Sequence, residues 1–117
     1  MATILVVDDD PGVLQIVTLL LQQKGHHILP ATNGLEALMV YSSYQLKIDL
    51  VLTDIDMPQM NGIDLADRIR VATPSPKIIF MSGREPDDLK GLEACTVLSK
   101  PFAPNKLIEV VDCALAS

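Results

Sequence analysis

Short apolar runs alternate along the chain with longer amphipathic segments, and four of these runs lead directly into a chemically capable side chain. The runs are 4–7, 50–53, 78–81 and 97–99, and they lead into Asp8, Asp54, Ser82 and Lys100. Apolar runs of about four residues between helical patterns are typical of strands in a parallel sheet that is buried on both faces. Such strands all end at one edge of the sheet, so we expect these four side chains to converge there.

The longer segments carry the apolar spacing of helices. In the segment 11–24, Val13 and Val17 lie on one helical face, Asp10 precedes the segment as a candidate N-cap, and Gly25 follows it as a stop signal. The other predicted elements are a short strand over 27–30, a helix from Asn33-Gly34 to about Tyr44, a helix capped by Asn61, a brief helix over about 86–92 and a last helix from about Pro104.

The regular alternation of strands and helices predicts an α/β fold with a doubly wound parallel sheet and right-handed crossovers. Five strands without a Gly-rich phosphate loop favour the flavodoxin-like (βα)5 arrangement, with strand order 2-1-3-4-5. The segment between Gly83 and Ala94 leaves room only for a shortened fourth helix. No repeat, linker or low-complexity tract interrupts the pattern, so we expect residues 1–117 to form a single domain.

Composition narrows the class of protein further. The net charge is −6, and no cluster of Lys and Arg marks a nucleic-acid-binding surface. The chain opens without a secretory signal and has no apolar stretch long enough to insert into a membrane, so we expect a cytoplasmic protein. Two isolated cysteines, Cys95 and Cys113, are too few for a disulfide framework or a zinc site.

The strand ends combine acids, a hydroxyl and an ammonium group. Crowded carboxylates repel one another unless a cation joins them, so Asp8, Asp9 and Asp54 at one edge predict a divalent cation site, with Mg²⁺ favoured by all-oxygen ligands. Lys100 adds a positive charge for a phosphoryl oxygen, and Ser82 adds a hydroxyl donor. These groups together neutralise a transferring phosphoryl group, and a carboxylate can accept it as an aspartyl phosphate.

Several segments resemble the receiver domains of two-component response regulators, and together they cover nearly the whole chain. The matching segments are 4–10, 33–38, 54–62, 81–83 and 100–102, of which 54–62 is the most specific. The resemblance implies a phosphorylatable switch rather than an enzyme that turns over a metabolite. Its implied partners are a sensor histidine kinase or phosphotransfer protein as donor, and an output domain or downstream protein. Receivers of hybrid histidine kinases share the Met-Ser-Gly and Lys-Pro-Phe segments.

The resemblance also implies a role for each acid at the sheet edge. Asp54 would be the phosphoacceptor, and hydrolysis would reset it. Asp9 and Asp54 would bind Mg²⁺ directly, the backbone carbonyl of Asp56 would be a third ligand, and Asp8 would act mainly through water. Lys100 would pair first with Asp54 and then with the phosphoryl group.

Ser82 would move to hydrogen-bond the phosphoryl oxygen, and the Lys100-Pro101 bond would be cis, which X–Pro bonds alone tolerate cheaply.

Two features depart from the family pattern. Val97 stands where many members carry a rotating aromatic residue. The interval from Ser82 to Lys100 is shorter than usual by roughly one helical turn. Both changes fall on the face that many receivers use for output or dimerisation.

A third departure is a pair of charges at the mouth of the expected site. Asp56 and Arg84 each lie two residues after a strand-end residue, and we hypothesise that they form an ion pair that alters the access of hydrolytic water. Two separately solvated side chains are the alternative.

His26 and His27 are adjacent in a predicted strand region and would face opposite ways, so we expect surface residues rather than a metal site.

Three other classes share parts of the pattern. Asp54-Ile55-Asp56 resembles the nucleophile motif of haloacid-dehalogenase-like phosphohydrolases, but there the acid pair comes last in the sequence, whereas Asp8-Asp9 comes first here. A flavodoxin-like electron carrier would need aromatic residues to hold a flavin, and the chain has no Trp. A pseudoreceiver that only binds partners would lack the acceptor or the lysine, and neither is missing.

Overall fold

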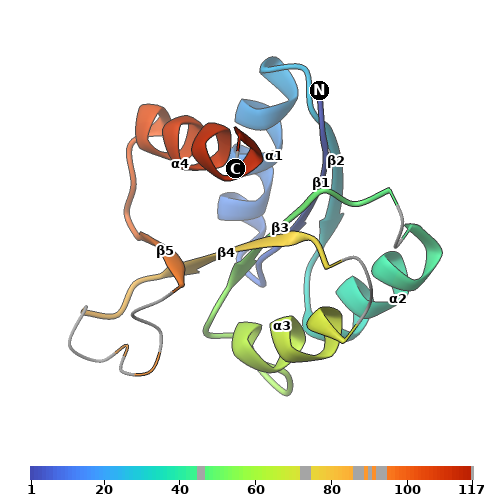
Figure 1. Cartoon of the computed structure of the whole chain (residues 1–117). Coiled ribbons are helices and arrows are strands. Elements are labelled where there is room, and N and C mark those ends of the chain that lie inside the picture. The colour runs from blue at the N-terminus through green and yellow to red at the C-terminus, as the bar shows by residue number, and fades with distance from the viewer. Residues whose placement is uncertain (45–46, 72–74, 86–88, 90, 92–94, 117) are drawn as a thin grey trace.

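The computed structural model describes residues 1–44, 47–71, 75–85, 89, 91 and 95–116 (Figure 1). Its strands are β1 (Thr3–Val7), β2 (His27–Ala31), β3 (Leu50–Asp54), β4 (Lys77–Ser82) and β5 (Thr96–Ser99). Its helices are α1 (Pro11–Gln23), α2 (Gly34–Tyr44), α3 (Gly62–Arg70) and α4 (Pro104–Ala116). The brief helix predicted over 86–92 falls largely outside the described residues. Within the described residues, no helix is long and apolar enough to cross a membrane.

All five strands are parallel and follow the order β2-β1-β3-β4-β5, which confirms the predicted flavodoxin-like sheet. Helices α1 and α4 cover one face, and α2 and α3 cover the other (Figure 1). Because successive side chains of a strand alternate between faces, β1 contributes to both layers. Ile4 and Val6 pack with α1 and α4, whereas Leu5 and Val7 pack with α2 and α3. This double burial explains the unbroken apolar runs.

Helix caps fix where three helices begin, immediately after loops at the carboxyl edge of the sheet. The Asp10 side chain accepts a hydrogen bond from the Gly12 N–H at 2.9 Å, and the Asn61 side chain accepts one from the Asp64 N–H at 2.9 Å. The Asn33 side chain likewise accepts from the N–H of Glu36 at 2.7 Å. Each cap satisfies a backbone donor that the first helical turn leaves unpaired, so the predicted helix starts are confirmed.

The loop between β3 and α3 is held in a tight conformation. A Cβ atom at Gly62 would lie 2.1 Å from the backbone oxygen of Asp54, so only glycine allows α3 to start this close to the end of β3. Within the loop, Gln59 has a φ of 70°, and the Met60 N–H donates to the Pro58 carbonyl at 2.8 Å. This three-residue turn is a strained arrangement for a residue with a side chain.

Candidate functional site

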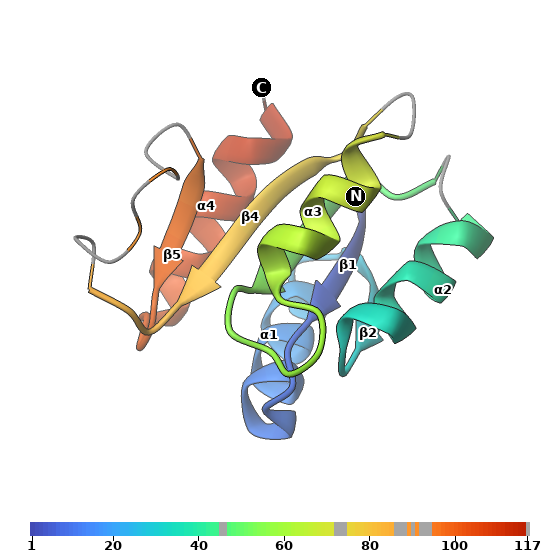
Figure 2. The ribbon, with the colours of Figure 1, turned by 90° about the horizontal axis from the view of Figure 1, so that it is seen from below.

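The strand-end residues of the sequence converge at one edge of the sheet. Figure 2 shows the arrowheads of β1, β4 and β5 pointing toward that edge. Asp8 follows β1 directly, Asp54 and Ser82 are the last residues of β3 and β4, and Lys100 follows β5. The backbone N–H of Lys100 donates to the Ser82 carbonyl at 2.7 Å, which fixes the end of β5 beside the end of β4.

Three carboxylates form the acidic part of the site. Asp8 is fully buried, Asp54 is 6% exposed and Asp9 is exposed, and one carboxylate oxygen from each lies within 4.8 Å of the others. Asp8 Oδ1 also accepts the N–H of Asp10 at 2.9 Å, which orients its carboxylate. Three oxygen donors at this spacing, open to solvent through Asp9, fit a hard cation such as Mg²⁺.

Lys100 joins two of these acids. Its Nζ lies 2.8 Å from Asp8 Oδ2 and 3.5 Å from Asp54 Oδ1. Burial disfavours the charged ammonium group, but the hydrogen bond and charge of Asp8, followed by those of Asp54, outweigh it and raise the pKa of Lys100. Lys100 therefore stays protonated at neutral pH and offers a fixed positive charge beside Asp54.

The environment of Asp54 disfavours the charged form of its carboxyl group. Burial, followed by the nearby charge of Asp8, raises the pKa of Asp54 to about 6, and Lys100 only partly offsets this rise. Asp54 is therefore mostly ionised at pH 7 but is poorly solvated, and its charge is not fully compensated by its neighbours. A cation that binds beside such a carboxylate stabilises its charged form strongly.

Ser82 lies next to the acidic cluster on the neighbouring strand. Met81 pairs with Asp54 in the sheet, so Ser82 extends one residue beyond that pair. Its side chain is almost completely buried, and its Oγ accepts the backbone N–H of Arg84 at 3.0 Å. The hydroxyl therefore lies at the site edge, held by the loop that follows β4.

Asp56 and Arg84 form the hypothesised ion pair. Arg84 Nε donates to Asp56 Oδ2 at 3.1 Å, and Arg84 Nη2 donates to Asp56 Oδ1. Both side chains are about half exposed, so the pair lies at the surface and spans the loops that follow β3 and β4. Arg84 therefore holds the side chain of Asp56, the last residue of the Asp54-Ile55-Asp56 motif, at the surface.

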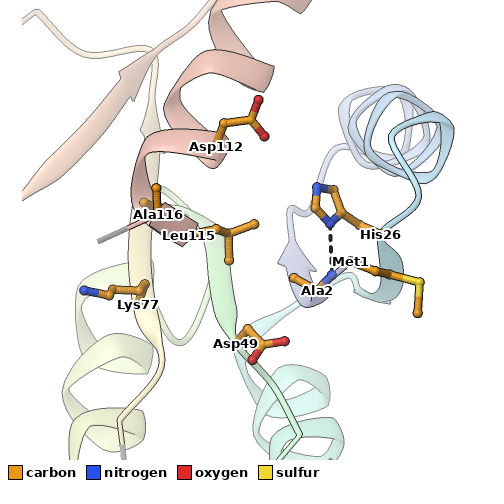
Figure 3. A pocket seen from close by; sticks show the side chains of 9 residues that line it. Met1, Ala2, His26, Asp49, Lys77, Asp112, Leu115 and Ala116 are labelled. Atoms are coloured by element: carbon orange, nitrogen blue, oxygen red, sulfur yellow. Dashed lines mark hydrogen bonds between the residues drawn. The ribbon is translucent and has the colours of Figure 1, made fainter.

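Other residues named from the sequence lie outside the cluster. Asp10 caps α1, as predicted. His26 lines an open hollow of about 620 Å³ where the strands begin, and its Nδ1 accepts the Ala2 N–H at 3.1 Å (Figure 3). His27 is exposed at the start of β2. Val97 is partly buried and packs against a small core cluster that contains Phe80. The Lys100-Pro101 bond is cis, as the resemblance implied.

Thr53 is a buried residue beside the site that the sequence pattern did not reveal. This residue is fully buried, and its Oγ1 donates to the backbone carbonyl of Asp54 at 3.0 Å. Thr is common in strands, so its place before Asp54 carried no distinctive signal. The close approach of Gly62 to Asp54 was equally invisible, because it depends on how α3 packs against the end of β3.

The fold and site define the class of doubly wound α/β proteins with an acidic cluster at the strand ends, and comparisons identify the family. The model of the response regulator receiver domain matches residues 4–112. The chain therefore belongs to the response regulator receiver domain family, the phosphoacceptors of two-component systems.

Individual relatives agree with this assignment. The chain is 33% identical over 118 residues to the transcriptional regulatory protein GlrR of Escherichia coli, covering 97% of this chain and 26% of that protein. It is 33% identical over 114 residues to the chemotaxis protein CheY of Thermotoga maritima, covering 93% of each. The chain spans about a quarter of the length of the first curated relatives it matches.

Solved structures show the same fold. The receiver domain of the hybrid histidine kinase CckA matches with a TM-score of 0.86 at 31% identity, covering 97% of this chain and 99% of that one. The response regulator TrrA of Thermotoga maritima, solved in complex with Mg²⁺ and BeF, matches with a TM-score of 0.85 at 36% identity, covering 98% and 100%.

Proposed function

We propose that Asp54 accepts a phosphoryl group from the phosphohistidine of a histidine kinase or phosphotransfer protein. The observation that carries this proposal is the position of Lys100 Nζ, between the carboxylates of buried Asp8 and Asp54 at the strand ends. This arrangement places a nucleophilic carboxylate beside a fixed positive charge and a potential cation site. We further propose that residues 1–117 act as one receiver domain that does not itself bind nucleic acid.

The transfer proceeds by attack of an Asp54 carboxylate oxygen on phosphorus. A P–O bond forms, the P–N bond of the donor breaks, and the histidine ring keeps the bonding electrons. Lys100 and the Ser82 hydroxyl stabilise the charge on the phosphoryl oxygens. Attack by water on the same phosphorus later releases inorganic phosphate and restores the Asp54 carboxylate.

The acidic cluster would hold a magnesium ion for this transfer. Asp8, Asp9 and Asp54 would hold it, with the backbone carbonyl of Asp56 as a further ligand, and Asp8 would act mainly through water. When bound, Mg²⁺ neutralises charge on the carboxylates and on the phosphoryl oxygens. The raised pKa of Asp54 supports this assignment, because it reflects a carboxylate whose charge is incompletely compensated.

The phosphoryl donor needs a docking surface beside Asp54. A groove of about 350 Å³ between α1 and the segment after β5 includes Lys100 itself, and its walls are apolar apart from that residue. Ile16 on α1 is 58% exposed at this groove, and α1 contains no charged residue. We assign the groove to the donor, which would bring its phosphohistidine to the site by apolar contact. A covalently attached output domain or a separate downstream protein then responds to the phosphorylated form.

Incubation with acetyl phosphate and Mg²⁺, followed by intact-protein mass spectrometry, tests the proposal without a cognate kinase. We expect the mass of one phosphoryl group to be added, and no addition when Mg²⁺ is chelated. Asp54→Asn should abolish uptake, whereas Asp10→Asn should retain it, because Asp10 only caps α1. Equal uptake by the Asp54→Asn variant would contradict the assignment of the acceptor.

A further inference from the structure

Helix α2 has an outer surface that is poor in charge and rich in apolar side chains. Only Glu36 is charged among its eleven residues, whereas α3 carries four charged residues in nine. Of the seven strongly exposed large apolar side chains in the described part of the chain, three lie on α2. They are Leu35, Met39 and Tyr44, which are 59%, 71% and 42% exposed. Such a surface indicates a contact with another protein surface.

The same surface contains a hollow as well as projections. An open groove of about 520 Å³ is lined by Leu35 and Met39 and also by Gln59, from the loop after β3. A contact related by a twofold axis needs projecting and receiving features on one patch, because each copy presents the same surface. We propose that α2 is the contact between two copies of this chain, arranged antiparallel about an axis at Met39.

The antiparallel register brings complementary side chains together. With Met39 on the axis, Leu35 lies opposite Ser43 of the second copy, so a large side chain meets a small one. The Ser43 hydroxyl already donates to the Met39 carbonyl of its own helix at 3.2 Å, so covering it leaves no donor unpaired. Glu36 lies opposite Ser42 of the second copy, and no like charges meet.

Other surfaces are less suited to self-association. The edge strand β2 carries Pro30, which is exposed. The His27 N–H donates to the Ala2 carbonyl, and the Ala31 carbonyl accepts the Asp8 N–H, so the backbone groups of both residues face β1. Backbone groups alternate in direction along a strand, so those of Pro30 face outward, where proline has no N–H to donate. The exposed groove on α1 includes Lys100 of the phosphorylation site. The net charge of −6 opposes association of two copies at every surface, so a contact that is poor in charge adds the least local repulsion.

The size of the contact sets its strength. An eleven-residue helix is about 16 Å long, so two such helices bury well under the ~1,600 Å² of a standard interface. We therefore expect a weak, reversible dimer rather than a permanent one.

Sedimentation velocity from about 10 μM to about 1 mM measures this equilibrium. The sedimentation coefficient of the unmodified protein should rise with concentration. Met39→Glu should weaken association more than tenfold, because it places two carboxylates at the axis. Ile16→Glu is the matched control, with the same change at an exposed apolar residue of α1, and it should leave association unchanged. A monomer at every concentration, or loss of association in Ile16→Glu alone, would overturn the proposal.

Disulfide trapping tests the register independently. In a background that lacks Cys95 and Cys113, Met39→Cys should cross-link to its own copy on oxidation, because it lies on the axis. Leu35→Cys and Ser43→Cys should cross-link to each other in a mixture, more than either does alone. Efficient self-linking of Ser43→Cys without self-linking of Met39→Cys would rule out this register.

Discussion

The neighbours of Asp54 compensate the charge of its carboxylate only in part. Lys100 lies closer to Asp8 than to Asp54, at 2.8 Å against 3.5 Å, so its attraction is shared with a fully buried competitor. Burial and the charge of Asp8 then leave the pKa of Asp54 raised to about 6. The structure thus holds a carboxylate whose ionised form is destabilised, and we expect phosphorylation or cation binding to relieve this.

The unfavourable environment of the Asp54 carboxylate should make the free energy of unfolding depend on pH when Mg²⁺ is chelated. The pKa of Asp54 is about 6 in the folded protein and 3.8 in an unperturbed carboxyl, so the folded state binds a proton more tightly. The contribution of Asp54 to the free energy of unfolding should therefore rise by about 2–3 kcal/mol as the pH falls from 7 to 4. Urea denaturation of the unmodified protein and of Asp54→Asn measures it. An identical pH slope in both proteins would contradict the raised pKa.

The ion pair of Asp56 with Arg84 should slow hydrolysis of the aspartyl phosphate, because it spans the loops on two sides of the site mouth. We expect Asp56→Ala to shorten the phosphoryl lifetime several-fold, measured by loss of label after the donor is removed. Asp67→Ala is the matched control, since Asp67 pairs with Arg70 on α3. If Asp56→Ala and Asp67→Ala lose the label at the same rate as the unmodified protein, the pair has no such role.

At the scale of elements, the loop from β3 to α3 connects the acceptor to the helical layer. Gly62→Ala would place a Cβ within 2.1 Å of the Asp54 carbonyl, so α3 would have to shift. We expect a loss of about 2–4 kcal/mol in the free energy of unfolding, measured with urea. Gly83→Ala is the control, because a Cβ there meets no atom within 4 Å. Equal stability of the two variants would contradict the close approach.

Helix α1 carries the prediction about the donor. Ile16→Glu introduces a charge into the groove beside Lys100, so phosphotransfer from a phosphorylated histidine kinase or phosphotransfer protein should fall at least tenfold. Phosphorylation by acetyl phosphate should stay unchanged, because the small donor needs no docking surface. If both reactions fall together, the change acts on the site itself rather than on docking.

The sequence was most informative about features set by local chemistry. Apolar runs identified the strands, Asp10 and Asn61 identified helix starts, and the parallel arrangement was enough to bring Asp54 and Lys100 together. The Asp56–Arg84 pair was also predictable, because both residues follow neighbouring strands at the same spacing. Each of these depends on short-range pattern plus one rule of sheet geometry.

Features that depend on packing between distant segments could not be predicted in this way. The approach of Gly62 to the Asp54 carbonyl requires the placement of a whole helix, and the φ of Gln59 follows from the loop that this placement closes. The groove beside α2 arises from a loop and a helix that are separate in the sequence. Exposure of Met39 likewise follows from how α2 is rotated on the sheet.

The whole molecule separates its surfaces by chemistry. The phosphorylation site lies at the carboxyl edge of the sheet, the proposed donor groove runs from it along α1, and the proposed self-contact lies on α2, across the sheet from α1. The hollow that contains His26 lies at the opposite, amino-terminal edge (Figure 3). We therefore expect substitutions to alter phosphorylation, donor binding and self-association one at a time.

We propose that Asp54 is the residue that carries the phosphoryl group. Borohydride reduces an aspartyl phosphate to homoserine, so reduction after treatment with acetyl phosphate and Mg²⁺, followed by peptide mass spectrometry, locates the modified position. We expect homoserine at position 54 and unmodified aspartate at Asp8, Asp9 and Asp56. Homoserine at any of those three positions, with Asp54 unmodified, would contradict it.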